Sequence, residues 1–189
     1  IVLMTGYLLA PFFLIIPLMF STIVGAESFV GEKERKTLEA LLYTPATDAE
    51  LFFAKVAASV VPAVGLGWFT FLVYTVVVNA AGYPQMGRIW FPLVNWWPLM
   101  LWVTPAIATL GMAVIVIISA RVGTFMEAYQ VSGSLVVVVL ALIVGQVTGL
   151  LYLSLWTSII VGVVVWVLDA ALILFGIRNF QRSALLSRL

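Results

Sequence analysis

Side chains that could do chemistry are scarce in this chain of 189 residues. It holds nine Lys and Arg, eight Asp and Glu, and neither His nor Cys. Thiol chemistry, His- or Cys-based haem ligation, the common zinc sites and His-based triads are therefore excluded. Asp169 and Glu127 are the acids that lie within or beside apolar stretches and could act there. We expect no catalytic residue and no metal site.

Asp169 is the more unusual of the two acids because apolar residues surround it in the sequence. An ionised Asp at the centre of a membrane helix costs about 2.5–3.5 kcal/mol on insertion scales, so it should face protein or water. We expect a salt bridge to a cation such as Lys55 or Arg121. A cation site, a proton site and a charged gate are the alternatives. Glu127 lies nearer an interface, and we expect a structural role for it.

Residues 31–37, GEKERKT, end in Lys-Thr as a phosphate-binding loop does. They lack the second Gly before the Lys, and no strand precedes them. We therefore expect no nucleotide site in this chain. The net charge of +1 also gives no reason to expect a nucleic-acid partner.

The elements that position these residues are predicted from hydropathy. Hydrophobic residues make up 64% of the chain and charged residues 9%, against roughly 25% charged in soluble domains. Blocks of about 20 apolar residues are long enough to cross a bilayer as helices. The sequence predicts an all-α integral membrane protein with one transmembrane domain, residues 1–189. The expected spans are residues 1–25, 52–80, 97–120, 128–150 and 155–177.

Lys and Arg are distributed unevenly between the two sides of these spans, and cytoplasmic segments are the ones enriched in them. If the loop 26–51 is inside, Arg88 alone lies outside. The inner segments then hold Lys33, Arg35, Lys36, Lys55, Arg121, Arg178, Arg182 and Arg188. We therefore expect a multi-pass protein of the cell membrane with a cytoplasmic tail, residues 178–189. The chain is apolar from Ile1, so we expect sequence upstream of it.

Aromatic residues gather in the outer segment between the second and third spans, residues 81–97. Tyr and Trp are enriched where membrane helices meet the headgroups. We expect an interfacial belt of Tyr83, Trp90, Phe91, Trp96 and Trp97, and an exit gate for an apolar substrate is the alternative.

The loop 26–51 carries the most specific pattern in the chain. Leu38, Leu41 and Leu42 recur at helical spacing within residues 31–43, which predicts a short amphipathic helix. Thr47 and Glu50 then form a capping-box pattern that starts the next helix. The amphipathic helix either lies on the lipid surface as an anchor or docks into the groove of a partner protein.

Residues 27–55 and residues 119–130, SARVGTFMEAYQ, resemble the two inner loops of permeases of type-2 ABC transporters. The resemblance implies that this chain contains spans two to six of a six-span permease. It also implies that the amphipathic helix is the coupling helix that contacts a partner ATPase. The implied contact residues are Glu32, Glu34, Arg35, Lys36, Leu38, Glu39, Leu41 and Leu42, with Arg121 and Glu127 as a second inner contact.

The same resemblance implies the partners. They are an ABC ATPase subunit that binds ATP and Mg, a second permease copy or homologue, and the lipid bilayer. This chain would bind no cofactor, catalyse no reaction and form half of an exporter. A secondary transporter or channel, and a structural subunit of a membrane complex, are the alternatives.

Overall fold

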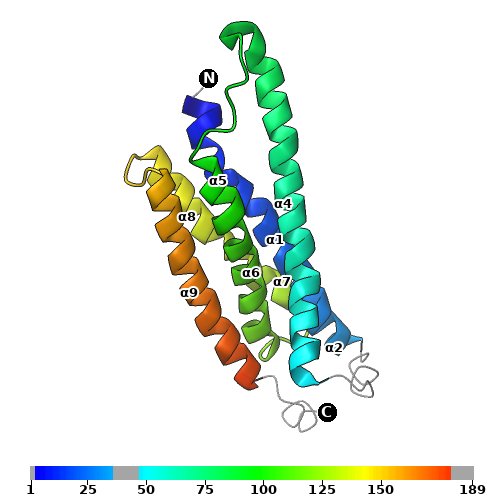
Figure 1. Ribbon diagram of the computed structural model, residues 1–189. Helices are drawn as coiled ribbons and strands as arrows, with labels where there is room; N and C mark the ends of the chain where they lie inside the picture. The colour runs from blue at the N-terminus through cyan, green and yellow to red at the C-terminus, as the bar shows by residue number, and fades with distance from the viewer. Residues whose placement is uncertain (1–2, 36–46, 180–189) are drawn as a thin grey trace.

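The computed structural model describes residues 3–35 and 47–179, which form a bundle of long helices (Figure 1). Five helices are long and apolar enough to cross a membrane: Met4–Glu34, Ala49–Met86, Trp96–Ser119, Phe125–Val147 and Leu155–Gly176. The described residues contain no strand. The prediction of an all-α membrane protein with five spans is confirmed.

The first helix begins irregularly, with the π-helical turn η1 (Met4–Leu8) and the 3₁₀ segment η2 (Ala10–Leu14), before α1 (Ile15–Ala26). Pro11 has no N–H, so the Tyr7 carbonyl loses its regular helical donor. Side chains from three other parts of the chain donate to successive carbonyls here. Tyr74 Oη reaches Thr5 O at 2.8 Å, Trp96 Nε1 reaches Gly6 O at 2.6 Å, and Gln146 Nε2 reaches Tyr7 O at 2.6 Å.

The first helix also continues past residue 25, where a loop was expected. After α1 come the π-helical turn η3 (Glu27–Gly31) and the short α2 (Glu32–Glu34). The expected loop 26–51 is therefore wrong for residues 26–34, because Phe29 and Val30 are buried with Phe52 and hold the helix onto the bundle. Residues 31–34 belong to this helix. Most of the predicted coupling helix 31–43 lies outside the described residues.

Helix α4 (Asp48–Met86) begins at the predicted capping box. Glu50 N donates to Thr47 Oγ1 at 3.3 Å, and Thr47 N donates to Glu50 Oε2 at 2.7 Å. The helix ends at Gly87, whose φ of +62° suits a left-handed C-cap. It is longer at both ends than the predicted span 52–80, and Figure 1 shows it reaching beyond its neighbours.

The third span lies at the centre of the bundle. It consists of α5 (Trp96–Pro98), the π-helical turn η4 (Leu99–Val103) and α6 (Thr104–Ser119). Its most apolar window is 67% buried, whereas those of the other spans are 22–44% buried. Helix α6 packs against α1, α4 and α9.

The fourth apolar stretch is divided into α7 (Phe125–Gly133) and α8 (Val136–Val147) by a turn at Ser134 and Leu135. Helix α8 packs against η2 and α1 of the first helix. The fifth span is α9 (Leu155–Asn179), which packs against α6, η4 and α5.

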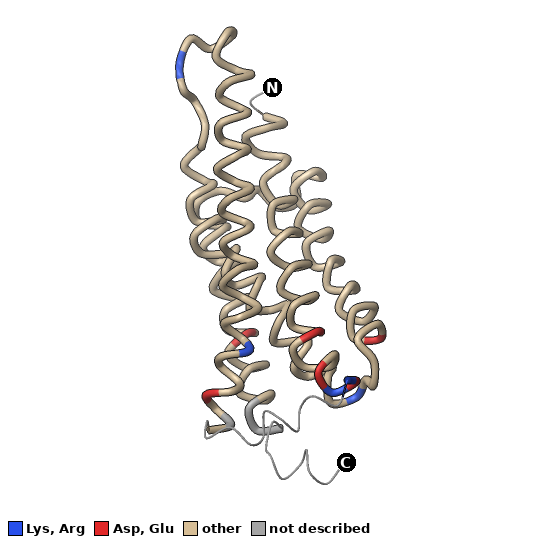
Figure 2. Tube along the Cα trace, turned by 90° about the vertical axis from the view of Figure 1, so that its right-hand side faces the viewer, with Lys and Arg blue, Asp and Glu red and all other residues tan. Residues whose placement is uncertain are grey.

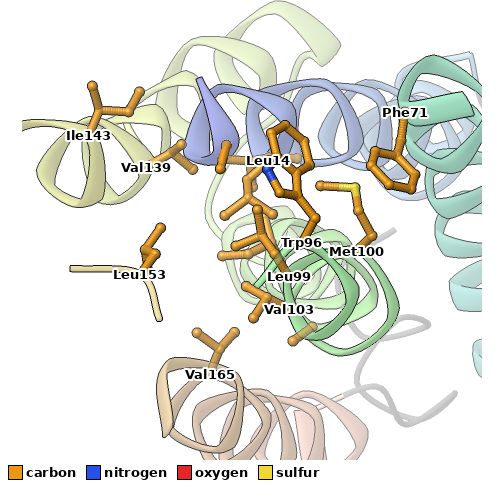
Figure 3. Close-up of a cluster of buried hydrophobic side chains, with 14 of the residues drawn as sticks. Leu14, Phe71, Trp96, Leu99, Met100, Val103, Val139, Ile143, Leu153 and Val165 are labelled. Atoms are coloured by element: carbon orange, nitrogen blue, oxygen red, sulfur yellow. The ribbon is translucent and has the colours of Figure 1, made fainter. Parts of the chain in front are cut away.

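The largest buried cluster surrounds Trp96, which contributes no exposed surface (Figure 3). Its ring stacks on Phe71 and Tyr74 and meets the edge of Phe91. The expected interfacial belt is therefore wrong for Trp96 and Phe91. They lie in the core because the segment after α4 folds back into the bundle, where Asn79 Oδ1 accepts from the N–H groups of Trp90 and Phe91.

Candidate functional site

Charged residues gather toward one end of the bundle, as the colouring of the chain in Figure 2 shows. We call this the charged end and define it by residues 27–35, 47–55 and 120–127. In the same view, the connection after α4, which contains Arg88, carries the one blue segment at the opposite end. The distribution predicted from the sequence therefore has a spatial counterpart among the described residues.

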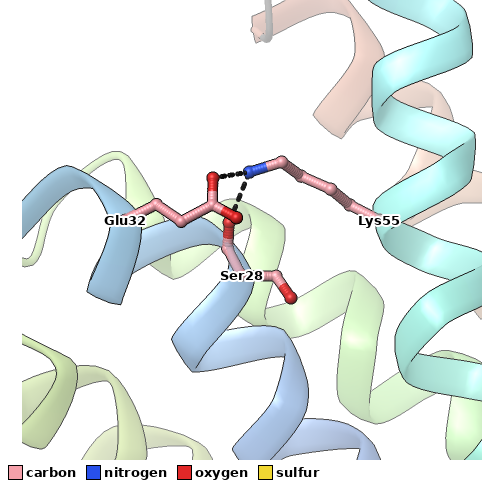
Figure 4. A network of polar contacts seen from close by, with 3 residues as sticks. All are labelled: Ser28, Glu32 and Lys55. Carbon is pink, nitrogen blue, oxygen red and sulfur yellow. Dashed lines mark hydrogen bonds and ion pairs between the residues drawn. The ribbon is translucent and has the colours of Figure 1, made fainter. Parts of the chain in front are cut away.

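Lys55 ties the end of the first helix to α4 (Figure 4). Its Nζ donates to a carboxylate oxygen of Glu32 and to the backbone carbonyl of Ser28, and it lies 5.2 Å from the ring centroid of Phe29. The Lys55 and Glu32 side chains are 12% and 30% exposed, so water screens this ion pair only partly. It therefore holds helix to helix more firmly than a surface pair would.

Glu34 ties the same helix end to α7. Its Oε2 accepts from the backbone N–H of Phe125, the first residue of α7, at 2.8 Å. A carboxylate at a helix N-terminus satisfies a free N–H and interacts favourably with the helix dipole. Thr124 caps the same terminus by accepting from Glu127 N at 3.2 Å.

Arg35 pairs with Glu27 at 2.9 Å, with side chains 69% and 44% exposed. Such an exposed pair contributes about 0–1 kcal/mol, so its role in stability is small. It lies on the helix surface directly before residues 36–46.

These contacts give three of the predicted partner-contact residues partners within the chain. Glu32, Glu34 and Arg35 all lie at the charged end, each in a hydrogen bond or ion pair. Lys36, Leu38, Glu39, Leu41 and Leu42 lie outside the described residues. Sequence reasoning did not assign Lys55 to this group, because nothing in the pattern reveals a contact across 23 residues.

The predicted second inner contact lies beside the first. Arg121 and Glu127 are both exposed, on either side of the connection that leads into α7. Glu127 Oε2 accepts from Gly123 N at 3.0 Å. The Glu34 contact at Phe125 therefore joins the end of the first helix to the start of α7.

Asp169 does not form the expected salt bridge. It is 1% exposed, and within the described residues neither carboxyl oxygen has a hydrogen-bond partner. The expected pairing with Lys55 is wrong because Glu32, which the extended first helix brings close, occupies the ammonium group. Arg121 forms no salt bridge to Asp169 either. No group of three metal-binding side chains occurs in this part of the chain.

These features define a multi-pass helical membrane protein with charged residues gathered at one end and no catalytic cluster among the described residues. The family model for ABC-2 family transporter proteins matches residues 4–166. The chain therefore belongs to the ABC-2 transporter family and is a membrane permease of an ABC transporter, a subunit that works with an ATPase subunit in a membrane complex. No curated protein and no solved structure matches the chain.

Proposed function

We propose that this permease is the membrane half of an exporter that is moved by a partner ATPase docked on its charged end. The partner binds ATP and Mg, and a second permease copy or homologue completes the pathway. One observation carries the proposal: the chain on both sides of residues 36–46 is fastened to the bundle. Lys55 of α4 holds Glu32 on one side of this segment, and Glu34 holds α7.

A force on residues 36–46 would therefore reach more than one helix. The first helix and α4 flank the segment directly, and the Glu34 contact would pass the force on to α7. A partner that binds the segment differently in its ATP and ADP states shifts the equilibrium between two packings of these helices. This permease then needs no chemistry of its own.

The test uses Leu41→Asp, which puts a charge on the apolar stripe of the proposed coupling helix, and Leu41→Met as its matched control. We expect both variants to insert into the membrane. Leu41→Met should retain the ATPase subunit that copurifies with the tagged permease from native membranes. Leu41→Asp should lose it and lose ATP-driven transport, because a charge buried in a docking groove without a partner is costly. Full retention of the ATPase and of transport by Leu41→Asp would contradict the proposal.

Charge reversal can distinguish residues that bind the ATPase from residues that hold the helices of the permease together. Reversing Glu34 and Arg35 would break contacts within the chain as well as any contact with a partner. The sharper pair is Lys36→Glu with Glu39→Lys, compared with Glu34→Gln. We expect the first change to weaken copurification and the second to leave the ATPase bound while lowering transport per ATP hydrolysed. A secondary transporter would instead transport in vesicles that contain the permease alone.

A further inference from the structure

The buried carboxyl of Asp169 has no role in the proposed function. It is 1% exposed in the middle of α9, and neither oxygen has a hydrogen-bond partner among residues 3–35 and 47–179. Buried polar groups are nearly always paired, and an unpaired buried charge is far more costly than an unpaired neutral group. The site therefore requires an explanation.

The face of α9 that carries Asp169 is the face that meets α6. Gly162, Asp169 and Gly176 follow one another at intervals of seven residues, close to two helical turns. A Cβ added at Gly162 would clash with the Trp102 ring, and one added at Gly176 would lie 2.8 Å from Val116 Cγ1. The two glycines thus allow α9 to approach the third span closely above and below the acid.

Within the described residues, the elements that pack most against α9 carry no counter-charge for Asp169. The elements that make the main contacts with α9 are α6, η4 and α5, and their residues, 96–119, include no Asp, Glu, Lys, Arg or His. Gly162 faces Trp102 and Gly176 faces Val116, so α9 and the third span run side by side in the same direction. Asp169, midway between the two glycines, therefore lies at the level of Thr109, midway between Trp102 and Val116. The Thr109 hydroxyl donates its proton to Pro105 O at 2.8 Å, so this hydroxyl does not donate to the Asp169 carboxyl.

The cation Lys55, which the sequence suggested as a partner of Asp169, is engaged elsewhere. Lys55 is bound to Glu32. The site lacks the ligands for a divalent cation, since no three metal-binding side chains come together in the described part of the chain.

We propose that Asp169 is an intramembrane proton-binding site between α9 and α6. In this packing the carboxyl is neutral and holds its proton. When α9 moves away from α6 and water enters, the O–H bond breaks, the proton passes to water and the carboxylate remains. The ligand is a proton, and its release accompanies a change in the packing of α9 on the third span.

Infrared spectroscopy of the purified full chain tests the protonation directly. Near pH 7 ordinary Asp and Glu, with pKa values of about 3.9 and 4.3, are ionised. We expect a carbonyl band of a protonated carboxylic acid that moves in D₂O. The band should vanish in Asp169→Asn and persist in the control Asp48→Asn, which changes the other Asp of the chain.

Isotope labelling keeps this test decisive if Asp169→Asn fails to fold. Carboxyl-¹³C aspartate should shift the band in both the native chain and Asp48→Asn. Absence of the band, or a band that ignores the label, would overturn the proposal. A band that disappears when Na⁺ or K⁺ replaces a large organic cation would assign the site to a metal cation and would also overturn it.

The link to packing is tested by cross-linking. A Cβ built on Gly176 lies 3.8 Å from Val116 Cβ, a spacing that suits a disulfide, and the chain has no native Cys. We expect oxidant to join Val116→Cys to Gly176→Cys at neutral pH. At alkaline pH the yield should fall severalfold relative to the same pair carrying Asp169→Asn, which cannot ionise. An identical pH course in the two backgrounds would overturn the coupling.

Discussion

Lys55 is the residue that sets the geometry of the charged end. Its ammonium group contacts Glu32, the Ser28 carbonyl and the face of the Phe29 ring, all on the first helix. Its own helix, α4, begins only a few residues earlier at the capping box. One side chain therefore fixes the distance between the end of the first span and the start of the second.

Loss of Lys55 should destabilise the permease. In Lys55→Met the apolar stem is kept, but the partly buried Glu32 carboxylate loses its partner. We expect a loss of about 1.5–3 kcal/mol, the usual range for hydrogen bonds to charged groups. Lys55→Arg should retain most of the stability. The measurement is thermal unfolding in detergent.

A double-mutant cycle with Glu32→Gln is the control for this prediction. If the ion pair is responsible, Lys55→Met should cost less in the Glu32→Gln background than in the native chain. Equal costs in the two backgrounds would contradict the pairing.

The pairing of Lys55 also shows where prediction from sequence stopped at the residue scale. An acid within a span and a cation near its end suggested a salt bridge between Asp169 and Lys55. The sequence does not show whether Asp169 or Glu32 pairs with Lys55. The outcome depends on whether the first helix continues through Glu32. Its continuation depends on the burial of Phe29 and Val30, which is a tertiary effect.

The irregular start of the first helix is the main feature at the scale of elements. Pro11 removes one backbone donor, and side chains from elsewhere replace the regular helical pattern. Within a membrane, freed carbonyls are tolerated where neighbouring helices satisfy them. The start of the first span is therefore specified by its neighbours and less by its own sequence.

Gln146→Leu should destabilise this region, because it removes the donor to the Tyr7 carbonyl. Polar contacts of this kind average about 0.6 kcal/mol in membrane proteins and reach about 1.7 kcal/mol, which bounds the expected loss. Pro11→Ala supplies an N–H four residues after Tyr7, the regular donor position. The double variant Pro11→Ala with Gln146→Leu should therefore regain most of the stability in thermal unfolding. Failure of Pro11→Ala to rescue Gln146→Leu would contradict this account.

Element boundaries were predictable where a local signal sets them. The pattern of Thr47 and Glu50 is local, and the structure has the capping box at that position. The division between α7 and α8 carries no Pro, and only the short polar run Ser132, Gly133 and Ser134 interrupts the apolar residues there, so one span was expected. Gly145 contacts Leu151 of the following connection, a contact fixed by the turn at Gly149 with its φ of +77°. Contacts of this kind are invisible in hydropathy.

At the scale of the whole molecule, the two ends of the bundle differ in chemistry. The charged end holds the ion pairs of Lys55 with Glu32 and of Arg35 with Glu27, and the exposed Arg121 and Glu127. The opposite end is fastened by hydrogen bonds from neutral side chains, among them Asn79 to Phe91 O and Trp96 to Gly6 O. Cytoplasmic segments of membrane proteins carry the excess of Lys and Arg. The charged end is thus expected inside.

Cysteine labelling tests this orientation, since the chain contains no Cys and needs no prior substitution. Gln85 is exposed near the end of α4, and Ser187 belongs to the C-terminal tail. A membrane-impermeant maleimide added to intact cells should label Gln85→Cys. It should label Ser187→Cys only after the cells are opened.

The unsubstituted chain is the control and should stay unlabelled under both conditions. The expected result follows from two independent features. The excess of Lys and Arg predicts that the charged end is inside. Within the described residues, α4 runs from that end to Gln85 at the opposite end, whereas α9 runs back toward the charged end (Figure 1). Labelling of Ser187→Cys from outside intact cells would place the charged end outside. An ATPase in the cytoplasm could then not reach residues 36–46, and the proposed route of coupling would fail with the topology.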